Sequence, residues 1–98
     1  VEELAKQQLY VVDVRTPEEW QSGHIPGAHH LELIHLENRF QELPRDQSIA
    51  LVCRSGIRAS LAASLLKKYG FPVVVNVRGG MQAWKQAGLP IMLENGKK

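Results

Sequence analysis

The sequence predicts an α/β domain with a central, mostly parallel sheet of four to five strands and helices on both faces. Two observations carry this prediction. Short apolar runs rich in Val and Ile alternate with helix-like segments through short connections. The runs are almost continuously apolar, which is typical of strands covered on both faces. The predicted strands are Tyr10–Val14, Ile49–Val52 and Val73–Val77.

The first two predicted helices lie on either side of the first strand. A short helix is expected over Leu4–Leu9. After the strand, Thr16 can cap a helix in which Pro17 takes the first position and Glu19 completes a capping box. Gly23 ends this helix, and His24–His29 is expected to turn into a short extended piece.

Three further helices are predicted from apolar spacing and from residues that end helices. One spans Leu33–Leu43 and stops at Pro44, one spans Ser60–Tyr69 before Gly70, and the last, Met81–Ala87, follows a turn at Gly79-Gly80. The buried face of the middle one is expected to carry Leu61, Ala62, Leu65, Leu66 and Tyr69.

Length and composition indicate one globular domain over residues 1–98, with a structured core over about 4–90 and a tail over 94–98. The chain is 44% hydrophobic and 22% charged. Its net charge of +2 is small and scattered, which does not favour nucleic acid as a partner. No apolar run reaches the roughly 20 residues of a membrane span. The one cysteine excludes an internal disulfide and fits a reducing compartment, so we expect a cytoplasmic protein.

That cysteine, Cys53, is the most informative residue. It closes the run Ile49–Val52 and opens the stretch Arg54-Ser55-Gly56-Ile57-Arg58. At a strand-to-helix turn, backbone N–H groups and the positive end of the helix dipole favour a negative charge. We therefore expect a reactive thiolate in a partly open, electropositive site. The alternative is a small hydrophobic residue at the end of a core strand, as most free cysteines are.

Three distant segments are expected to share one rim of the sheet, because ligands of parallel sheets bind beyond the carboxyl ends of the strands. They are Asp13–Arg15, Cys53–Arg58 and Arg78–Gly80. Within the first segment, Asp13 is interpreted as a supporting residue that accepts loop N–H groups or pairs with an arginine such as Arg15 or Arg58. Gly79-Gly80 is interpreted as a tight turn that approaches the cysteine loop closely.

The residues around Cys53 indicate an anion site with a nucleophile at its centre. No histidine lies nearby in sequence to serve as the base of a Cys-His protease. Two chemistries fit: attack on phosphate or arsenate, and attack on the sulfane sulfur of a donor such as thiosulfate. Cys53 and Arg58 enclose four residues, one fewer than in cysteine phosphatases, whose loops hold a tetrahedral oxyanion. The smaller loop favours a persulfide.

Several segments together resemble the signature of the rhodanese family of sulfurtransferases, above all its single-domain bacterial members. The resemblance runs from about Leu4 to Pro90. Its segments are Asp13-Val14-Arg15, Glu19-Trp20, Gly23-His24-Ile25-Pro26-Gly27-Ala28, Cys53-Arg54-Ser55-Gly56-Ile57-Arg58, Gly79-Gly80-Met81-Gln82-Ala83-Trp84 and Gly88-Leu89-Pro90. Ala59 departs from the pattern, since many relatives carry a hydroxyl residue there.

The resemblance implies a three-layer rhodanese-like fold and a ping-pong sulfur transfer. Cys53 would take a sulfane sulfur from thiosulfate or a persulfide donor and pass it to cyanide or a thiol. The N–H groups of Arg54, Ser55, Gly56, Ile57 and Arg58 would hold the persulfide, and Arg54 and Arg58 would attract the anionic donor. No cofactor or metal is implied.

Other interpretations stay open at this point. A rhodanese-like module can serve as a non-catalytic interaction or regulatory domain, and a phosphatase or arsenate reductase is a further, less favoured alternative. The chain begins at Val1, and the family's usual first strand would lie upstream of Leu4. We therefore expect a domain taken from a longer protein, with a fused or separate sulfur-metabolism partner. The four histidines are expected to be turn and surface residues without a metal, and Trp20 and Trp84 to be packing residues.

Overall fold

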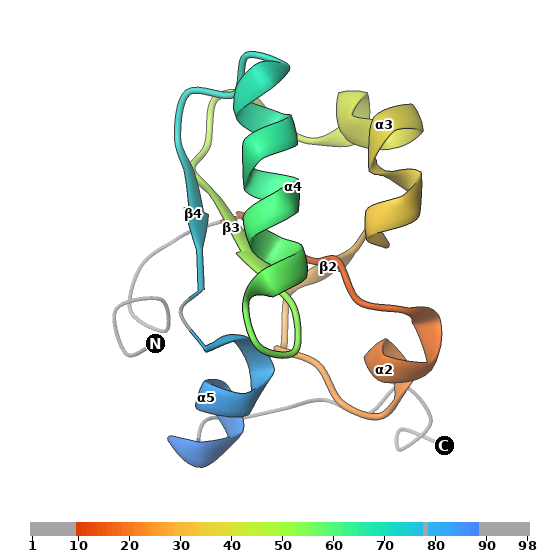
Figure 1. The fold of residues 1–98 in the computed structure, drawn as a ribbon, viewed down its shortest axis with the longest axis vertical. Coiled ribbons are helices and arrows are strands. Elements are labelled where there is room, and N and C mark those ends of the chain that lie inside the picture. The colour runs from red at the N-terminus through yellow and green to blue at the C-terminus, as the bar shows by residue number, and fades with distance from the viewer. Residues whose placement is uncertain (1–9, 78, 89–98) are drawn as a thin grey trace.

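A four-stranded parallel sheet forms the centre of the computed structural model, which describes residues 10–77 and 79–88 (Figure 1). The strands are β1 (Tyr10–Asp13), β2 (His29–His30), β3 (Ile49–Val52) and β4 (Val74–Asn76). They lie in the order β2-β1-β3-β4, and all three pairings are parallel. The predicted α/β class is confirmed. The predicted helix over residues 4–9, Arg78 and the predicted tail lie outside the described residues.

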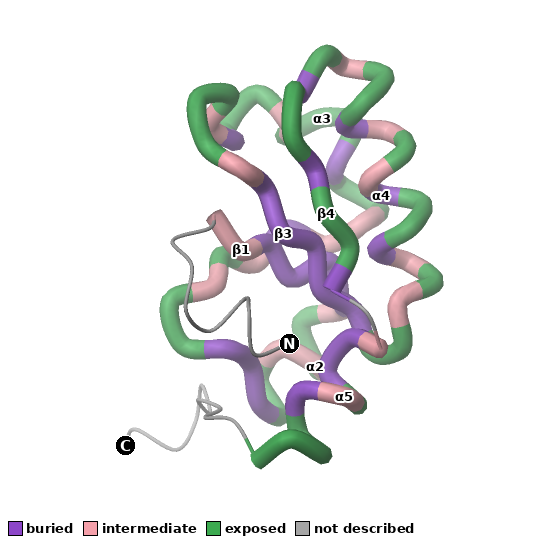
Figure 2. The backbone as a smooth tube through the Cα atoms, turned by 90° about the vertical axis from the view of Figure 1, so that its left-hand side faces the viewer, coloured by how far each residue is buried: buried purple, intermediate pink, exposed green. Residues whose placement is uncertain are grey.

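Helices pack on both faces of the sheet (Figures 1 and 2). The face with α4 (Ile57–Lys68) and α3 (Leu36–Arg39) lies opposite the face with α5 (Gly80–Gln86). The short helix α2 (Pro17–Gln21) follows β1, and the 3-10 turns Leu33–His35 and Phe40–Glu42 flank α3. In the described part of the chain, no helix is long and apolar enough to cross a membrane.

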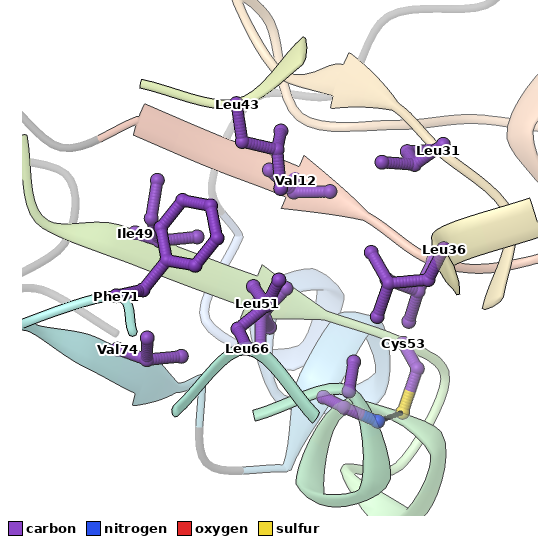
Figure 3. Close-up of a cluster of buried hydrophobic side chains, with 13 residues drawn as sticks. Val12, Leu31, Leu36, Leu43, Ile49, Leu51, Cys53, Leu66, Phe71 and Val74 are labelled. Carbon is purple, nitrogen blue, oxygen red and sulfur yellow. Dashed lines mark hydrogen bonds between the residues drawn. The ribbon is translucent and has the colours of Figure 1, made fainter. Parts of the chain in front are cut away.

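The sheet separates two hydrophobic clusters, which explains why the strand sequences are almost continuously apolar. On the α4 face, Ile49 and Leu51 of β3 pack with Leu66, as Figure 3 shows. On the α5 face, Ala50 and Val52 pack with Met81 and Trp84. All four residues of β3 are fully buried. Burying such side chains contributes about 1.5–3 kcal/mol each, so β3 is a rigid support for the residue that follows it.

Helix α2 confirms its predicted capping box. The Thr16 N–H donates to Glu19 Oε1 at 2.9 Å, and the Glu19 N–H donates to Thr16 Oγ1 at 3.3 Å. Pro17 stands in the first turn, where its missing N–H costs nothing. The helix ends at Gln21, just before Gly23 with its positive φ of 144°.

Helix α4 differs from its prediction at the start and in its buried face. It begins three residues early, at Ile57, because Gly56 adopts the left-handed conformation and begins the helix directly after the cysteine loop. The fully buried residues of α4 are Ala59, Ala62 and Leu66. Leu61, expected to be buried, is 57% exposed.

The predicted helix Leu33–Leu43 is also only partly correct. The segment is one α-helical turn, α3, between two 3-10 turns, and none of the three has a side-chain cap. The apolar spacing still places Leu36 and Leu43 in the core. Phe40 stacks on Tyr69 with 4.1 Å between ring centroids. The packing of these three side chains thus determines the path of the segment, and a regular helix is not needed to bury them.

Candidate active site

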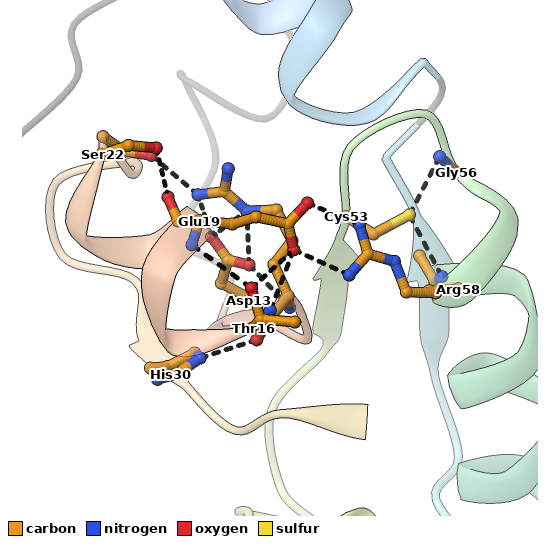
Figure 4. A network of polar contacts seen from close by, with 11 residues as sticks. Asp13, Thr16, Glu19, Ser22, His30, Cys53, Gly56 and Arg58 are labelled. Carbon is orange, nitrogen blue, oxygen red and sulfur yellow. Dashed lines mark hydrogen bonds and ion pairs between the residues drawn. The ribbon is translucent and has the colours of Figure 1, made fainter. Parts of the chain in front are cut away.

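Cys53 lies directly after β3, at the base of the segment Cys53–Arg58, which we call the active-site loop. Its sulfur accepts hydrogen bonds from the Gly56 N–H at 3.0 Å and from the Ala59 N–H at 3.4 Å (Figure 4). Both N–H groups belong to the loop and the first turn of α4, where the helix dipole is positive. Two N–H donors therefore converge on the sulfur at the end of β3.

The site is more enclosed than the sequence predicts. Cys53 is only 1% exposed and belongs to the hydrophobic cluster on the α4 face. The reason is that its side chain turns back under the loop toward the first turn of α4. Cys53 packs as a small buried residue, as one interpretation expects, and its sulfur also accepts two N–H groups; its reactivity stays a prediction.

Helix α5 holds the active-site loop from its outer side. The Met81 N–H donates to the Cys53 carbonyl at 2.7 Å, and the Gln82 N–H donates to the Arg54 carbonyl at 3.1 Å. With these carbonyls directed at α5, the loop can direct N–H groups at the sulfur. Gly80 makes this possible, since a Cβ there would collide with the Cys53 carbonyl oxygen and its φ is +55°. The predicted close approach of Gly79-Gly80 is confirmed.

Further donors of the loop are unused. Within the described residues, no acceptor faces the N–H groups of Ser55, Ile57 and Arg58. The Gly56 and Ala59 N–H groups, in contrast, already donate to the Cys53 sulfur. A group with negative charge next to the sulfur would satisfy the unused donors.

Arg58 does not stand free at the end of the loop. Its Nη1 and Nη2 donate to Glu19 Oε1 and Oε2 at 2.8 and 2.9 Å, and both side chains are about one third exposed (Figure 4). The hydrogen bonds from Arg58, opposed by partial burial, lower the pKa of Glu19 from 4.5 to about 2. The same hydrogen bonds raise the pKa of Arg58. The expected cationic attraction by Arg58 is therefore largely neutralised.

Arg54, Ser55 and Ile57 form the exposed part of the loop. Among the described residues, Arg54 has no acidic partner, so its positive charge is available at the mouth of the site. Ile57 is 77% exposed. The loop thus presents to solvent one arginine that has no partner in the described part of the chain, and one apolar side chain.

Asp13 and Arg15 form a buried pair beside the loop. Arg15 Nε and Nη2 donate to the Asp13 carboxylate at 2.9 and 2.8 Å, and Arg15 Nη2 also donates to the Gly23 carbonyl at 2.7 Å. Of the two proposed partners for Asp13, the structure selects Arg15. With both carboxylate oxygens bonded, Asp13 holds the end of β1 to the residues after α2 and is not a free base.

The prediction that all four histidines are turn or surface residues is wrong for His24. This residue is buried, because its ring stacks on Trp20 at 3.5 Å and its Nδ1 lies 2.9 Å from the Trp20 carbonyl. His30 is half-buried, with Nε2 2.7 Å from the Arg15 carbonyl. Within residues 10–77 and 79–88, no group of acidic, histidine or cysteine side chains is suited to a metal ion.

Comparison with known proteins agrees with this geometry. Residues 1–87 match the family model described as rhodanese-like domain. The chain belongs to the rhodanese-like domain family. Its three-layer fold has a close structural counterpart in a rhodanese-related protein from Thermoplasma volcanium. That crystal structure gives a TM-score of 0.86 at 32% identity, over 95% of this chain and 90% of the other.

Two curated relatives of this rhodanese-like domain carry names that bear on its chemistry. A sulfurtransferase of Allochromatium vinosum is 39% identical over 92% of this chain and 84% of its own length. The thiosulfate sulfurtransferase GlpE of Pseudoalteromonas translucida is 37% identical over 89% of this chain and 83% of its own length. These relatives support a role in sulfur transfer for the domain.

Proposed function

We propose that this rhodanese-like domain is a sulfurtransferase that carries sulfur as a persulfide on Cys53. The observation that carries the proposal is the position of the Cys53 sulfur. It lies at the base of a four-residue loop and accepts two N–H groups, from Gly56 and Ala59. Those donors stabilise a thiolate before the reaction, and after it they can hold the charge of a persulfide.

In the first half-reaction the Cys53 thiolate attacks the outer sulfur of thiosulfate. A bond forms between the Cys53 sulfur and that sulfane sulfur, and the sulfur–sulfur bond of thiosulfate breaks. Sulfite leaves with the electron pair. The negative charge moves to the outer sulfur of the persulfide, where the unused N–H groups of Ser55, Ile57 and Arg58 are available as donors.

In the second half-reaction a thiolate or cyanide attacks the outer sulfur. The new bond joins that sulfur to the acceptor, and the electron pair of the broken bond returns to Cys53 as a thiolate. The acceptor leaves as a persulfide or as thiocyanate. Electron pairs balance over the two steps. The reaction therefore needs no oxidant or reductant besides the sulfur donor and the sulfur acceptor.

The burial of the Cys53 sulfur favours a donor with an unhindered terminal sulfur. Because Cys53 is 1% exposed, a donor must reach it with a terminal atom that carries no substituent on the side facing the cysteine sulfur. The terminal sulfane sulfur of thiosulfate meets this condition. The exposed Arg54 would attract the double negative charge of that donor, while Arg58 with Glu19 would shape the rim.

The size of the loop supports sulfur over phosphate. Four residues separate Cys53 from Arg58, and N–H donors stabilise a developing anion only when they lie about 2.7–3.1 Å from it. Two of the donors already contact the cysteine sulfur. With this spacing, we expect the loop to hold one further sulfur and not a tetrahedral group with several oxygens.

The test is formation of thiocyanate from thiosulfate and cyanide. We expect the protein to be active and both Cys53→Ser and Cys53→Ala to be inactive, since no second cysteine can replace the nucleophile. Circular dichroism controls for folding, because removing the sulfur from the core cluster costs about 1 kcal/mol of stability. Substantial activity in a folded Cys53→Ala protein would show that the nucleophile is wrongly assigned.

A further inference from the structure

Asn76, the last residue of β4, contacts the active-site loop at the Gly56 carbonyl and the first turn of α4 at Ser60. Its amide nitrogen Nδ2 donates to the Gly56 carbonyl at 3.1 Å and to Ser60 Oγ at 2.7 Å. A carbonyl only accepts hydrogen bonds, so the contact with Gly56 fixes which end of the amide faces the loop. No sequence motif pointed to this residue, because the contact spans 20 residues of chain.

The fold places Asn76 where it can hold the loop. β4 pairs in parallel with β3, and Asn76 lies opposite Leu51, two residues before Cys53. Figure 1 shows β4 running beside α4, whose first turn follows the loop. Asn76 also borders an open hollow of about 470 Å³ beside the loop, lined by Ser55, Gly56, Ile57, Ser60, Asn76 and Gly79.

Gly56 needs such a restraint more than any other residue of the loop. It has a φ of +112°, a conformation that glycine adopts freely and leaves freely, and α4 has no side-chain cap at this position. Its N–H donates to the Cys53 sulfur at 3.0 Å, while its carbonyl accepts from the Ser60 N–H and from Asn76. Apart from Cys53, whose sulfur accepts the Gly56 N–H, Asn76 is the one side chain in the described residues that is bonded to Gly56.

We propose that Asn76 is a positioning residue, which holds Gly56 so that the Gly56 N–H stays directed at the Cys53 sulfur and favours its anionic form. For sulfur transfer, the inference rests on the proposed function. For the protonation of the Cys53 thiol, the inference rests only on the hydrogen-bond geometry of the loop. Asn76 is exposed, so its two hydrogen bonds would add little to global stability. Their effect is expected mainly at the sulfur.

The test is the pH profile of Cys53 alkylation by iodoacetamide. The ratio of the rate one pH unit below the wild-type midpoint to the rate at pH 10 reports the thiolate fraction at the lower pH, where that fraction scales with the acid dissociation constant of the thiol. The ratio also cancels changes in access to the sulfur. Because a net hydrogen bond contributes about 1 kcal/mol, we expect this ratio to fall about 3- to 10-fold in Asn76→Ala. Asn76→Leu, which keeps the side-chain volume but has no donor, should give the same fall if Asn76→Ala is poorly folded.

Two controls separate the route through Gly56 from other effects. Ser60→Ala removes only the second hydrogen bond of Asn76, and Asn38→Ala truncates an exposed asparagine on α3, away from the loop. Both should keep the wild-type ratio. An unchanged ratio in folded Asn76 variants, even with a lowered melting temperature, would overturn the proposal, and so would an equal fall in Ser60→Ala. Alkylation needs no sulfur donor, so the result stands whether or not a persulfide forms.

Discussion

Arg54 and Arg58 are the two cationic residues of the active-site loop, yet their surroundings differ. Arg58 is bonded to Glu19 through both terminal nitrogens, whereas Arg54 is exposed and has no acidic partner among the described residues. The sequence pattern predicts the same role for both. For the proposed sulfur transfer, and within the described part of the loop, the ion pair therefore favours Arg54 over Arg58 as the residue that attracts an anionic donor.

This assignment gives a kinetic prediction. Arg54→Ala should raise the KM for thiosulfate about 3- to 10-fold at low ionic strength, because an unpaired charge near the site attracts the dianion. Added salt should raise the wild-type KM and narrow the difference. Lys67→Ala, which removes one positive charge at the far end of α4, is the matched control and should leave KM unchanged. A larger, salt-sensitive effect in Arg58→Ala than in Arg54→Ala would contradict the assignment.

The ion pair of Glu19 and Arg58 joins two elements, α2 and α4, across the mouth of the site (Figure 4). The capping role of Glu19 follows from sequence, because a capping box is a local pattern. Its bond to Arg58 does not, since the partners are 39 residues apart. The exposure of Leu61 was missed for the same reason, because it depends on how distant elements pack. The start of α4 and the burial of His24 were missed although they rest on local features, the left-handed backbone of Gly56 and the stacking of His24 on Trp20 four residues before it.

At the element scale, this pair predicts a pH-dependent stability. The pKa of Glu19 is about 2 in the folded protein against an ordinary 4.5. A lowered pKa means that the stabilisation is complete above pH 4.5 and is lost as the pH falls toward 2. Glu19→Gln keeps the cap but not the ion pair, so at pH 7 it should lower the free energy of unfolding by about 1–2 kcal/mol.

Urea unfolding of both proteins between pH 7 and pH 2 measures this effect. The difference between wild type and Glu19→Gln should be constant above pH 5 and should shrink below it. Glu42→Gln is the matched control, because Glu42 pairs with Arg39 on a fully exposed surface and should contribute far less. A difference that persists unchanged down to pH 2 would show that the ion pair is not its source.

At the scale of the whole molecule, the parallel sheet is what brings the site together. Because β1 and β3 end at the same edge, Asp13 and Cys53 lie on one rim, as their positions after apolar runs predict. Apolar runs and glycine positions are local signals, so the fold class, the loop and the close approach of Gly80 could be predicted from sequence. The partner of Arg58, the depth of Cys53 and the contact of Asn76 could not, since each depends on three-dimensional packing.

Intact-mass measurement after incubation with thiosulfate, followed by peptide mapping, tests whether Cys53 carries a persulfide in a loop too small for phosphate. We expect a gain of one sulfur atom, located on Cys53, lost on addition of cyanide and absent in Cys53→Ser, with negligible hydrolysis of aryl phosphates. No added sulfur from thiosulfate or a glutathione persulfide, or phosphate-ester hydrolysis as fast as sulfur transfer, would contradict it.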